Sequence, residues 1–274
     1  MATTALINGQ AVDNEWFKER GFQFGDGLFE TIAVFDGAPC LLNRHFARLA
    51  KGCDVLGLPH PDFDQLTEEI YQLCNQVTQG VLKLFWTAGE SERGYSRPKA
   101  LSPKRILKVS QWPDFAHLDT SSVSIRRCKL KLSQQPVLSG LKHLNRLEQV
   151  IARNEWSDSS IAEGLMFDLK GNLVEGTMSN VFVQHNGSLS TPTLELSGVA
   201  GVVRDLAIDI GKEQGHELAV QQISNEDLSS AEAIYLTNSI IGVWRVGQLD
   251  KQIFDTTVAE HGLMSAVRQA VYQA

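Results

Sequence analysis

The chain has 274 residues, of which 43% are hydrophobic and 21% are charged, as is typical of a soluble globular protein with a sizeable core. Its net charge of -7 disfavours nucleic acid as a partner, because phosphate backbones are bound by basic surfaces. No apolar run reaches the ~18 residues of a membrane span, and no basic segment followed by an apolar run marks a signal peptide. The four cysteines are dispersed and lack zinc-site spacing, so we expect reduced thiols, no metal and a cytoplasmic location.

The first part of the chain predicts a small sheet accompanied by helices. The predicted strands cover residues 3–12, 28–35, 81–87 and 105–110, and the predicted helices begin near residue 43 and cover residues 62–77. Asn8-Gly9 and Asp36-Gly37 are typical of tight turns between antiparallel strands. The helices are predicted from apolar residues that recur every three or four positions.

A stretch around Pro113 separates this part from a second group of strands and helices. We therefore predict domains at 1–111 and 119–274, joined by a linker at 112–118. The second domain is predicted to contain strands at 123–132, 163–168, 173–184, 233–237 and 241–246, and helices at 144–156, 201–213, 225–230 and 257–272. Because strands cluster without strict βαβ alternation, the pattern indicates an α+β protein in two domains rather than a doubly wound parallel sheet.

Six short segments carry residues suited to cofactor chemistry. They are RGFQFGDGLFET from Arg20, HFARL from His45, ERGYS from Glu92, GLKHLNRLEQ from Gly140, EGTMSNVF from Glu175 and GVAGVVR from Gly198. In this order and spacing they resemble the fold-type IV pyridoxal-5'-phosphate (PLP) enzymes, which include branched-chain aminotransferases, D-amino acid aminotransferases and aminodeoxychorismate lyases. The resemblance covers nearly the whole chain. It implies a D-amino acid aminotransferase-like fold of two domains, with PLP bound between them.

The resemblance assigns the two central catalytic roles to Lys142 and Glu175. Local sequence alone favours an exposed lysine at position 142, whereas the resemblance implies the Schiff-base lysine, whose amine must be neutral to attack an aldehyde. Strand alternation places Glu175 on one face with Thr177 and Ser179, and Asn180 on the other. Local sequence leaves a surface glutamate equally open. The resemblance implies that Glu175 keeps the pyridine nitrogen of PLP protonated.

Further residues are expected to bind the cofactor phosphate. Arg48 matches the family's phosphate-binding arginine, and a planar guanidinium suits a phosphate. Arg44, on the same helix face, is interpreted as a solvated charge. Gly201, Val202 and Val203 open a helix, whose free N–H groups attract anions. The resemblance adds four further polar cofactor contacts, namely Ser179, Asn180, Asn238 and Ser239.

Two residues of the ERGYS segment, Arg93 and Tyr95, resemble substrate-side residues of the lyases. The chain departs from many bacterial lyases just before this segment, because it reads Thr87-Ala88-Gly89 where they have an arginine. The residues that bind the substrate carboxylates therefore stay open.

Within the family, the segments around Lys142 and Tyr95 look most like those of bacterial 4-amino-4-deoxychorismate lyases. This implies PLP-dependent elimination of pyruvate to give 4-aminobenzoate for folate synthesis. A D-amino acid or branched-chain aminotransferase is the alternative, because one fold supports both reactions. A binding protein without chemistry is disfavoured by the joint presence of Lys142, Glu175 and Arg48. The resemblance also implies a small-molecule substrate and a homodimer.

Overall fold

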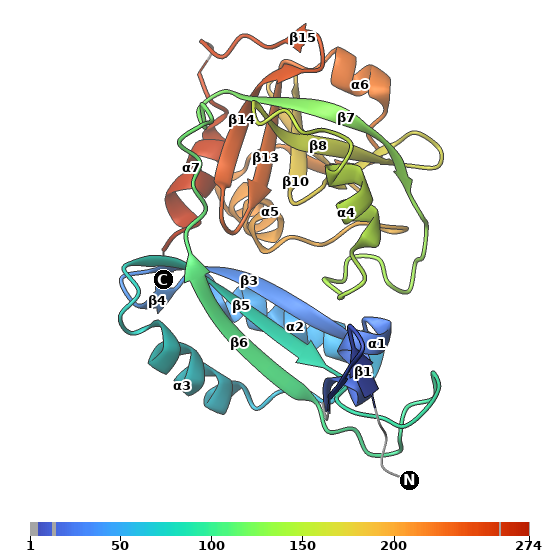
Figure 1. Ribbon diagram of the computed structural model, residues 1–274. Coiled ribbons are helices and arrows are strands. Elements are labelled where there is room, and N and C mark those ends of the chain that lie inside the picture. Colours follow the sequence, from blue (N-terminus) through green and yellow to red (C-terminus); the bar gives the residue numbers. More distant parts are fainter. Residues whose placement is uncertain (1–4, 13–14, 258, 274) are drawn as a thin grey trace.

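A computed structural model of the chain describes residues 5–12, 15–257 and 259–273. Figure 1 shows two bodies, a smaller one from the first part of the chain and a larger one from the rest. Each contains helices and strands, which confirms the predicted α+β class. The strand predicted at 3–12 and the helix predicted at 257–272 extend beyond the described ranges. No helix within those ranges is both long and apolar enough to cross a bilayer.

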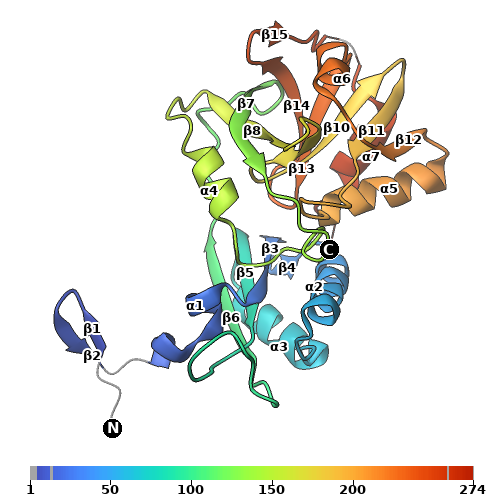
Figure 2. The same ribbon diagram turned by 90° about the vertical axis from the view of Figure 1, so that its right-hand side faces the viewer.

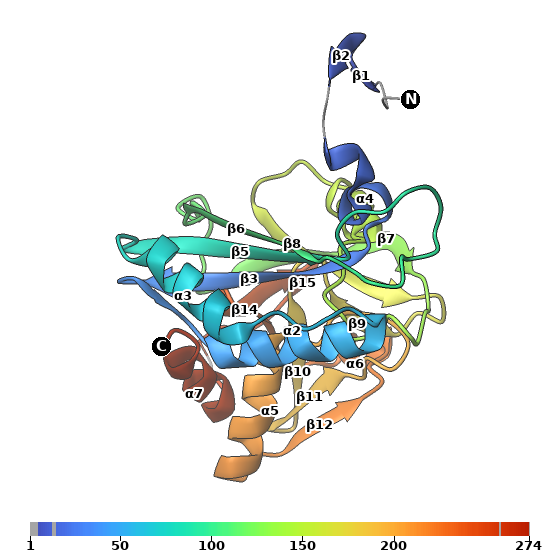
Figure 3. The ribbon, with the colours of Figure 1, turned by 90° about the horizontal axis from the view of Figure 1, so that it is seen from below.

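The smaller body is an antiparallel sheet with two helices on one face (Figure 3). In spatial order its strands are β4 (Ala38–Pro39), β3 (Gly27–Phe35), β5 (Gln79–Thr87) and β6 (Lys104–Gln111), and its helices are α2 (Leu42–Leu56) and α3 (Phe63–Cys74). Asp36 and Gly37 both have positive φ angles, so the predicted Asp-Gly turn joins β3 to β4. Ile32 of β3 meets Leu49 of α2 and Ile70 of α3 in one apolar core, which holds the helices on the sheet.

Short elements precede this sheet. They are β1 (Ala5–Ile7), β2 (Gln10–Val12), a 3-10 helix (Glu15–Lys18) and α1 (Arg20–Phe24). β1 and β2 form a separate hairpin that stands away from the two bodies in Figure 2. The glycine-rich segment 21–27 contributes to α1, a helix that its composition does not indicate. This helix ends at Gly25, which has a φ angle of 64°.

The larger body is a mixed sheet of nine strands, with the order β12-β11-β10-β13-β14-β7-β8-β9 and with β15 paired to β14. The bounds are β7 (Val123–Leu132), β8 (Ile161–Asp168), β9 (Leu173–Gly176), β10 (Asn180–His185), β11 (Ser188–Pro192), β12 (Leu218–Gln221), β13 (Ala233–Asn238), β14 (Gly242–Leu249) and β15 (Gln252–Ile253). Only the β11–β12, β14–β7 and β7–β8 pairs are parallel. The sheet is therefore mixed rather than doubly wound and parallel. This agrees with the prediction made from the order of strands and helices in the sequence.

Four helices accompany the larger sheet. They are α4 (Leu147–Arg153), α5 (Val202–Gln214), α6 (Asn225–Ser229) and α7 (Gly262–Ala270). α5 and α7 pack together against β13 and β14. Val203 and Leu263 of these helices share a core with Phe182 and Tyr235 of the sheet. This packing fixes the beginning of α5 close to the junction of the two bodies.

Three predicted elements are corrected by the structure. The helix predicted at 144–156 is only α4, because Leu144 pairs instead with β3 through its N–H group. The strand predicted at 173–184 is two strands, β9 and β10, separated by residues 177–179. The final helix is shorter than predicted and begins at Gly262.

The segment 140–144 joins the two bodies. The Gly140 N–H donates to Gly198 at 2.9 Å, and the Gly140 carbonyl accepts from Ala200 at 3.0 Å. Only three residues further on, His143 forms an antiparallel bridge with Leu28 of β3. One short segment is thus hydrogen-bonded to both bodies, and Lys142 lies between its two attachments.

Candidate active site

Lys142 lies where the two bodies meet. The Phe29 N–H donates to the Lys142 carbonyl at 2.9 Å, and Nζ lies 4.3 Å from the centroid of the Phe29 ring. Burial, reinforced by the charge of Arg48, lowers the pKa of the Lys142 amine from 10.5 to about 7. A large fraction of this amine is therefore neutral near pH 7, which is the form that attacks an aldehyde.

Glu175 and Asn180 both bind the backbone of Val199. The Val199 N–H donates to Glu175 Oε2 at 2.8 Å, and Asn180 Nδ2 donates to the Val199 carbonyl at 2.9 Å. The alternation predicted for one continuous strand does not extend from Glu175 to Asn180, because β9 and β10 are separate strands. Burial raises the pKa of Glu175, against the opposing influence of the Val199 N–H and of Arg146.

A buried carboxylate organises the interruption between β9 and β10. Glu163 is 1% exposed and accepts hydrogen bonds from the backbone of Gly164, Thr177 and Met178 and from the hydroxyls of Thr177 and Ser179. The Ser179 hydroxyl, predicted to contact the cofactor, thus donates to Glu163 at 2.8 Å. Through residues 177–179, Glu163 sets how Glu175 and Asn180 face Val199.

Arg48 belongs to a buried ionic cluster with Glu30 and His45. Its Nε and Nη2 both donate to the Glu30 carboxylate, and its Nη1 donates to the Ala200 carbonyl at 3.0 Å. His45 Nδ1 lies 2.6 Å from Glu30 Oε2. Burial would raise the pKa of Glu30, but Arg48 and His45 outweigh it and hold that pKa at about 2. Glu30 is therefore a carboxylate at neutral pH.

The tautomer of His45 follows from its two neighbours. Burial lowers the pKa of His45, although Glu30 opposes the shift, so the ring is neutral near pH 7. A neutral ring next to an ionised carboxylate carries its proton on Nδ1. Nε2, which lies 3.3 Å from the Ser239 oxygen, then accepts from the Ser239 hydroxyl. Ser239, a predicted cofactor contact, is in this way linked to the Arg48 cluster.

The beginning of α5 lies beside Arg48. Gly201 is the N-cap, and no side chain caps the first turn. A Cβ atom at Gly201 would lie 1.9 Å from Asn180 Oδ1, so any larger residue here would displace the Asn180 side chain. Because Ala200 accepts from Arg48, the first turn at Val202 and Val203 and the guanidinium are neighbours. An uncapped helix start next to a guanidinium is a site suited to a phosphate.

Asn238 supports the site from a neighbouring strand end. Its Nδ2 donates to the Met178 carbonyl at 2.9 Å, and its Oδ1 accepts from the N–H groups of Ile240 and Ile241 at 2.8 Å each. All of these partners are protein groups. Asn238 therefore braces the 177–179 turn against the turn that carries Ser239.

Arg93 and Tyr95 lie apart from these groups, on the loop between β5 and β6. Both are exposed, Tyr95 to 85%. Tyr95 helps to line a cavity of about 450 Å³, with Arg20, Phe24, Gly25, Asp26, Gly27, Leu56, Arg97, Leu138, His143 and Asn145. A second cavity, of about 330 Å³, shares Leu138, His143 and Asn145 with the first. Tyr95 thus lines the same cavity as His143 and Asn145, which follow Lys142 in the chain.

The residues present fit PLP. Lys142 offers a neutral amine for its aldehyde, Glu175 a buried carboxyl group for its ring nitrogen, and the uncapped α5 next to Arg48 a cradle for its phosphate. Sequence reasoning missed Glu30 and Glu163. The available signal was an acidic residue at an inward position of an apolar strand, which needs a buried partner.

Comparisons with known proteins agree with this fit. Residues 27–249 match the amino-transferase class IV family. A crystal structure of 4-amino-4-deoxychorismate lyase from Pseudomonas aeruginosa superimposes with a TM-score of 0.85 and 42% identity, covering 92% of each chain. Aminodeoxychorismate lyase of Vibrio harveyi is 29% identical over 86% of this chain and 88% of its own. A putative branched-chain-amino-acid aminotransferase of Methanocaldococcus jannaschii is 27% identical over 91% and 88%.

The fold and the lysine site define a fold-type IV enzyme that depends on PLP. The chain belongs to the amino-transferase class IV family, since the family match spans most of its length. The Pseudomonas aeruginosa and Vibrio harveyi proteins to which it is similar are both lyases.

Proposed function

We propose that the protein is a 4-amino-4-deoxychorismate lyase, which eliminates pyruvate from its substrate and releases 4-aminobenzoate. The observation that carries this proposal is the 42% identity to the Pseudomonas aeruginosa lyase over 92% of both chains, combined with a lysine whose pKa burial lowers to about 7. A sequence likeness of this extent favours a shared reaction over a shared fold alone.

We assign three residues to binding. Lys142 Nζ anchors the cofactor, Glu175 holds the proton of the ring nitrogen, and Arg48 with the start of α5 binds the phosphate. When bound, the cofactor supplies a protonated ring that accepts the electrons of a cleaved C–H bond. Ser179, Asn180, Asn238 and Ser239 keep these groups in place through their contacts with Glu163, Val199, Met178 and His45.

Lys142 also moves the proton. We assign Lys142 Nζ, whose pKa burial lowers in the cofactor-free protein, as the base that would remove the proton at C4 of the substrate. The bond between the ring carbon of the substrate and the oxygen of the enolpyruvyl group then breaks. The electron pair of this bond leaves with the enolpyruvyl group. The same Nζ gives the proton to the methylene carbon of the departing enolpyruvyl group, and this carbon becomes the methyl group of pyruvate. Arg93 and Tyr95 are assigned to the substrate side.

The experiment compares wild type, Lys142→Ala and a matched control, Lys170→Ala, an exposed lysine in a turn. Each PLP-treated protein is mixed with 4-amino-4-deoxychorismate, and 4-aminobenzoate and pyruvate are measured without any added keto acid. We expect both wild type and the control to form 4-aminobenzoate and pyruvate in equal amounts. Lys142→Ala should lose at least about a thousandfold in rate, as expected for a nucleophile that is also the base. A wild-type protein that forms no 4-aminobenzoate would overturn the proposal.

An aminotransferase is the second candidate, favoured by relatives such as the Methanocaldococcus jannaschii protein, which is 27% identical over 91% of this chain. It would use the same Lys142 and Glu175. The two reactions separate cleanly, because an aminotransferase converts its cofactor to the amine form when an amino acid is added alone. Loss of the absorbance of the bound aldehyde form with D-alanine or leucine, without 4-aminobenzoate from the lyase substrate, would identify the aminotransferase.

We also propose that the two sheets belong to domains at 1–111 and 119–274, with residues 112–118 as a linker and the cofactor between the domains. Each sheet has its own apolar core, which supports two separate folding units. β6 ends at Gln111 and β7 begins at Val123, so the proposed linker lies within the connection between the sheets.

We propose further that the protein forms a homodimer through α4. Leu147, Val150 and Ile151 share one face of this helix and are 75%, 51% and 57% exposed. An apolar helix face of this kind, directly after the Lys142 segment, suits a second copy of the chain. Light scattering should give twice the chain mass of 30.3 kDa. Ile151→Asp should shift it toward the monomer, and Leu169→Asp, at a 71% exposed turn, should not.

A further inference from the structure

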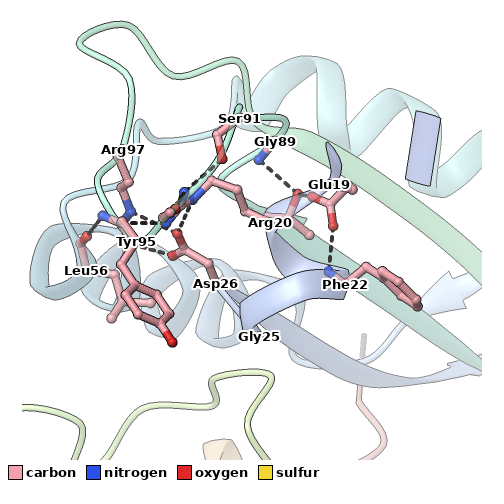
Figure 4. A network of polar contacts seen from close by, with 12 residues as sticks. Glu19, Arg20, Phe22, Gly25, Asp26, Leu56, Gly89, Ser91, Tyr95 and Arg97 are labelled. Carbon is pink, nitrogen blue, oxygen red and sulfur yellow. Dashed lines mark hydrogen bonds and ion pairs between the residues drawn. The ribbon is translucent and has the colours of Figure 1, made fainter. Parts of the chain in front are cut away.

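The loop between β5 and β6 has little regular structure to hold it. It runs from residue 88 to residue 103 and carries the exposed Arg93 and Tyr95. Its position therefore depends on contacts with the rest of the molecule. Backbone hydrogen bonds with Lys18 and Arg20 hold residues 89–91. Figure 4 shows that the side-chain contacts around Tyr95 converge on two arginines and one aspartate, namely Arg20, Arg97 and Asp26.

Arg20 fixes the middle of the loop. It is 3% exposed, and its guanidinium donates to Ser91 Oγ at 2.8 Å, to the Gly94 carbonyl at 3.3 Å and to the Tyr95 carbonyl at 2.9 Å. The remaining donor, Nε, binds Asp26 Oδ2 at 2.7 Å. The carbonyls of Gly94 and Tyr95 lie on either side of the Tyr95 side chain. A buried arginine that donates to both of them fixes the backbone from which this side chain extends.

Arg97 fixes the end of the loop. Its Nε donates to Asp26 Oδ2 at 3.0 Å, its Nη2 donates to Asp26 Oδ1, and its Nη1 donates to the carbonyl of Leu56 at the end of α2. Asp26 is therefore shared by both arginines. Although burial acts in the other direction, hydrogen bonds from Arg97 and Arg20 lower the pKa of Asp26, so it stays ionised and keeps both guanidinium groups in place.

Asp26 connects this cluster to the lysine segment. It lies in the turn Gly25–Gly27, where Asn145 Nδ2 donates to the Gly25 carbonyl at 3.1 Å and Leu144 donates to the Gly27 carbonyl at 3.0 Å. The turn, the loop and the lysine segment all contribute to the wall of the 450 Å³ cavity. The spacing between Tyr95 and the Lys142 segment is thus set through Asp26.

We propose that Arg20 and Asp26, with Arg97, are positioning residues that hold the Arg93–Tyr95 loop over the cavity beside the Lys142 segment and so determine substrate affinity. The proposal rests on the proposed function, because that function assigns Arg93 and Tyr95 to the substrate. None of the three positioning residues is required to touch the cofactor or the reacting atoms. Their loss should therefore weaken substrate binding more than it slows the chemical step.

The test uses the PLP-loaded full chain and the variants Asp26→Asn, Arg20→Lys and Arg97→Lys. Arg97 is partly exposed, so its variant remains informative if the more buried changes impair folding. The matched control is Arg105→Lys, because Arg105 makes an equally two-pronged pair, but with Glu69 of α3 and not with Asp26. Three quantities are measured: KM and kcat for the substrate, the rate of tryptic cleavage after Arg93, and the absorbance of the bound cofactor.

We expect the three variants to raise KM about tenfold, with kcat within about threefold, as for the loss of one positioning contact. Cleavage after Arg93 should become about tenfold faster, since a protease cuts the freed form of a loop. The cofactor absorbance and the control Arg105→Lys should match wild type.

Three results would overturn the inference: cleavage as slow as in wild type, faster cleavage with an unchanged KM, or the same shifts in the Arg105→Lys control. Failure of the proposed function looks different, because then wild type itself makes no 4-aminobenzoate. In that case the cleavage rates still test whether the cluster holds the loop. KM is then measured for the amino acid that converts the cofactor to its amine form.

Discussion

The two ends of the active site differ in the protonation states that their surroundings favour. Around Arg48, the carboxyl group of Glu30 is held ionised with a pKa of about 2, and the arginine is bound through both its Nε and Nη2. Around Lys142, burial lowers the pKa of the amine to about 7 and raises the pKa of Glu175. One end keeps ions paired, and the other drives its ionisable groups toward neutrality.

Under the proposed function, this difference separates binding of the cofactor phosphate from proton transfer. A phosphate needs a permanent positive charge in a fixed place, and the Glu30–Arg48 pair provides a guanidinium that cannot rotate away. Proton transfer needs groups that change their charge easily, which burial without a strong partner provides. The following changes test this contrast, from the largest expected effect to the smallest.

The first change removes the counter-ion at the anchoring end. Glu30→Gln leaves the 12% exposed Arg48 side chain without its carboxylate, so we expect a loss of about 3–5 kcal/mol in the free energy of unfolding of the apoprotein. Urea unfolding measures it. Glu69→Gln, which breaks the surface pair with Arg105, should destabilise the fold far less, because solvent screens that pair.

The Glu30 effect also has a sign in pH. Because the folded pKa of about 2 lies below the ordinary glutamate pKa of 4.5, the carboxylate stabilises the fold above pH 4.5, and this stability is lost as the pH falls toward 2. The difference between wild type and Glu30→Gln should therefore shrink over this window. A difference that stays constant down to pH 2 would contradict the ionic cluster.

The second change acts at the chemical end. Glu175→Gln keeps the size of the side chain but removes its acidity, so we expect kcat to fall by about 10²–10³ while PLP is retained. Single-turnover rates and the absorbance of bound PLP separate the two effects. Glu226→Gln, an exposed change on α6, serves as the control. Loss of cofactor together with activity would assign Glu175 to binding alone.

The third change tests the support between the two ends. Glu163→Gln leaves at least one of its donors unpaired, so we expect a loss of about 1–3 kcal/mol in stability and weaker PLP binding. Equilibrium titration with PLP and thermal unfolding report both. Thr177→Val, which removes only one of the donors, should give a smaller change in the same direction. Unchanged PLP affinity in both variants would show that the 177–179 turn holds without Glu163.

The smallest expected effect is a pH dependence. The rate of PLP binding to the apoprotein should rise with pH around a midpoint of about 7, because the neutral amine of Lys142 is the reactive form. Since the folded pKa lies below 10.5, burying the charged amine destabilises the apoprotein at low pH, and this cost disappears between pH 7 and 10.5. Stopped-flow absorbance measures the rate. A midpoint near 10 would mean that Lys142 is solvated.

The sequence predicted the α+β class and the family because whole motifs carry Lys142, Glu175 and Arg48. It could not predict the length of α4, because residues 142–144 are drawn into pairing with β3, more than a hundred residues earlier. Local helical spacing contains no information about so distant a partner. The short strands β4, β12 and β15 were missed for the same reason, since each is defined mainly by its neighbour in the sheet.

The site residues divide in the same way. Glu175 could be recognised by its motif, but its position relative to Asn180 could not, because the interruption between them depends on Glu163 from another strand. Glu30 was likewise hidden, since its role comes from Arg48 and His45 on the packed helix. The role of an ionisable group inside an apolar strand depends on partners that only folding brings close to it.

The attachment of segment 140–144 to both bodies has a mechanical consequence. If the bodies moved apart, either the backbone hydrogen bonds at Gly140 or the one from the Phe29 N–H to the Lys142 carbonyl would have to break. The fold therefore ties separation of the two bodies to displacement of Lys142, the proposed nucleophile. Release of the cofactor and separation of the bodies should occur as one cooperative event during unfolding, so the colour of the protein would report on the integrity of its whole architecture.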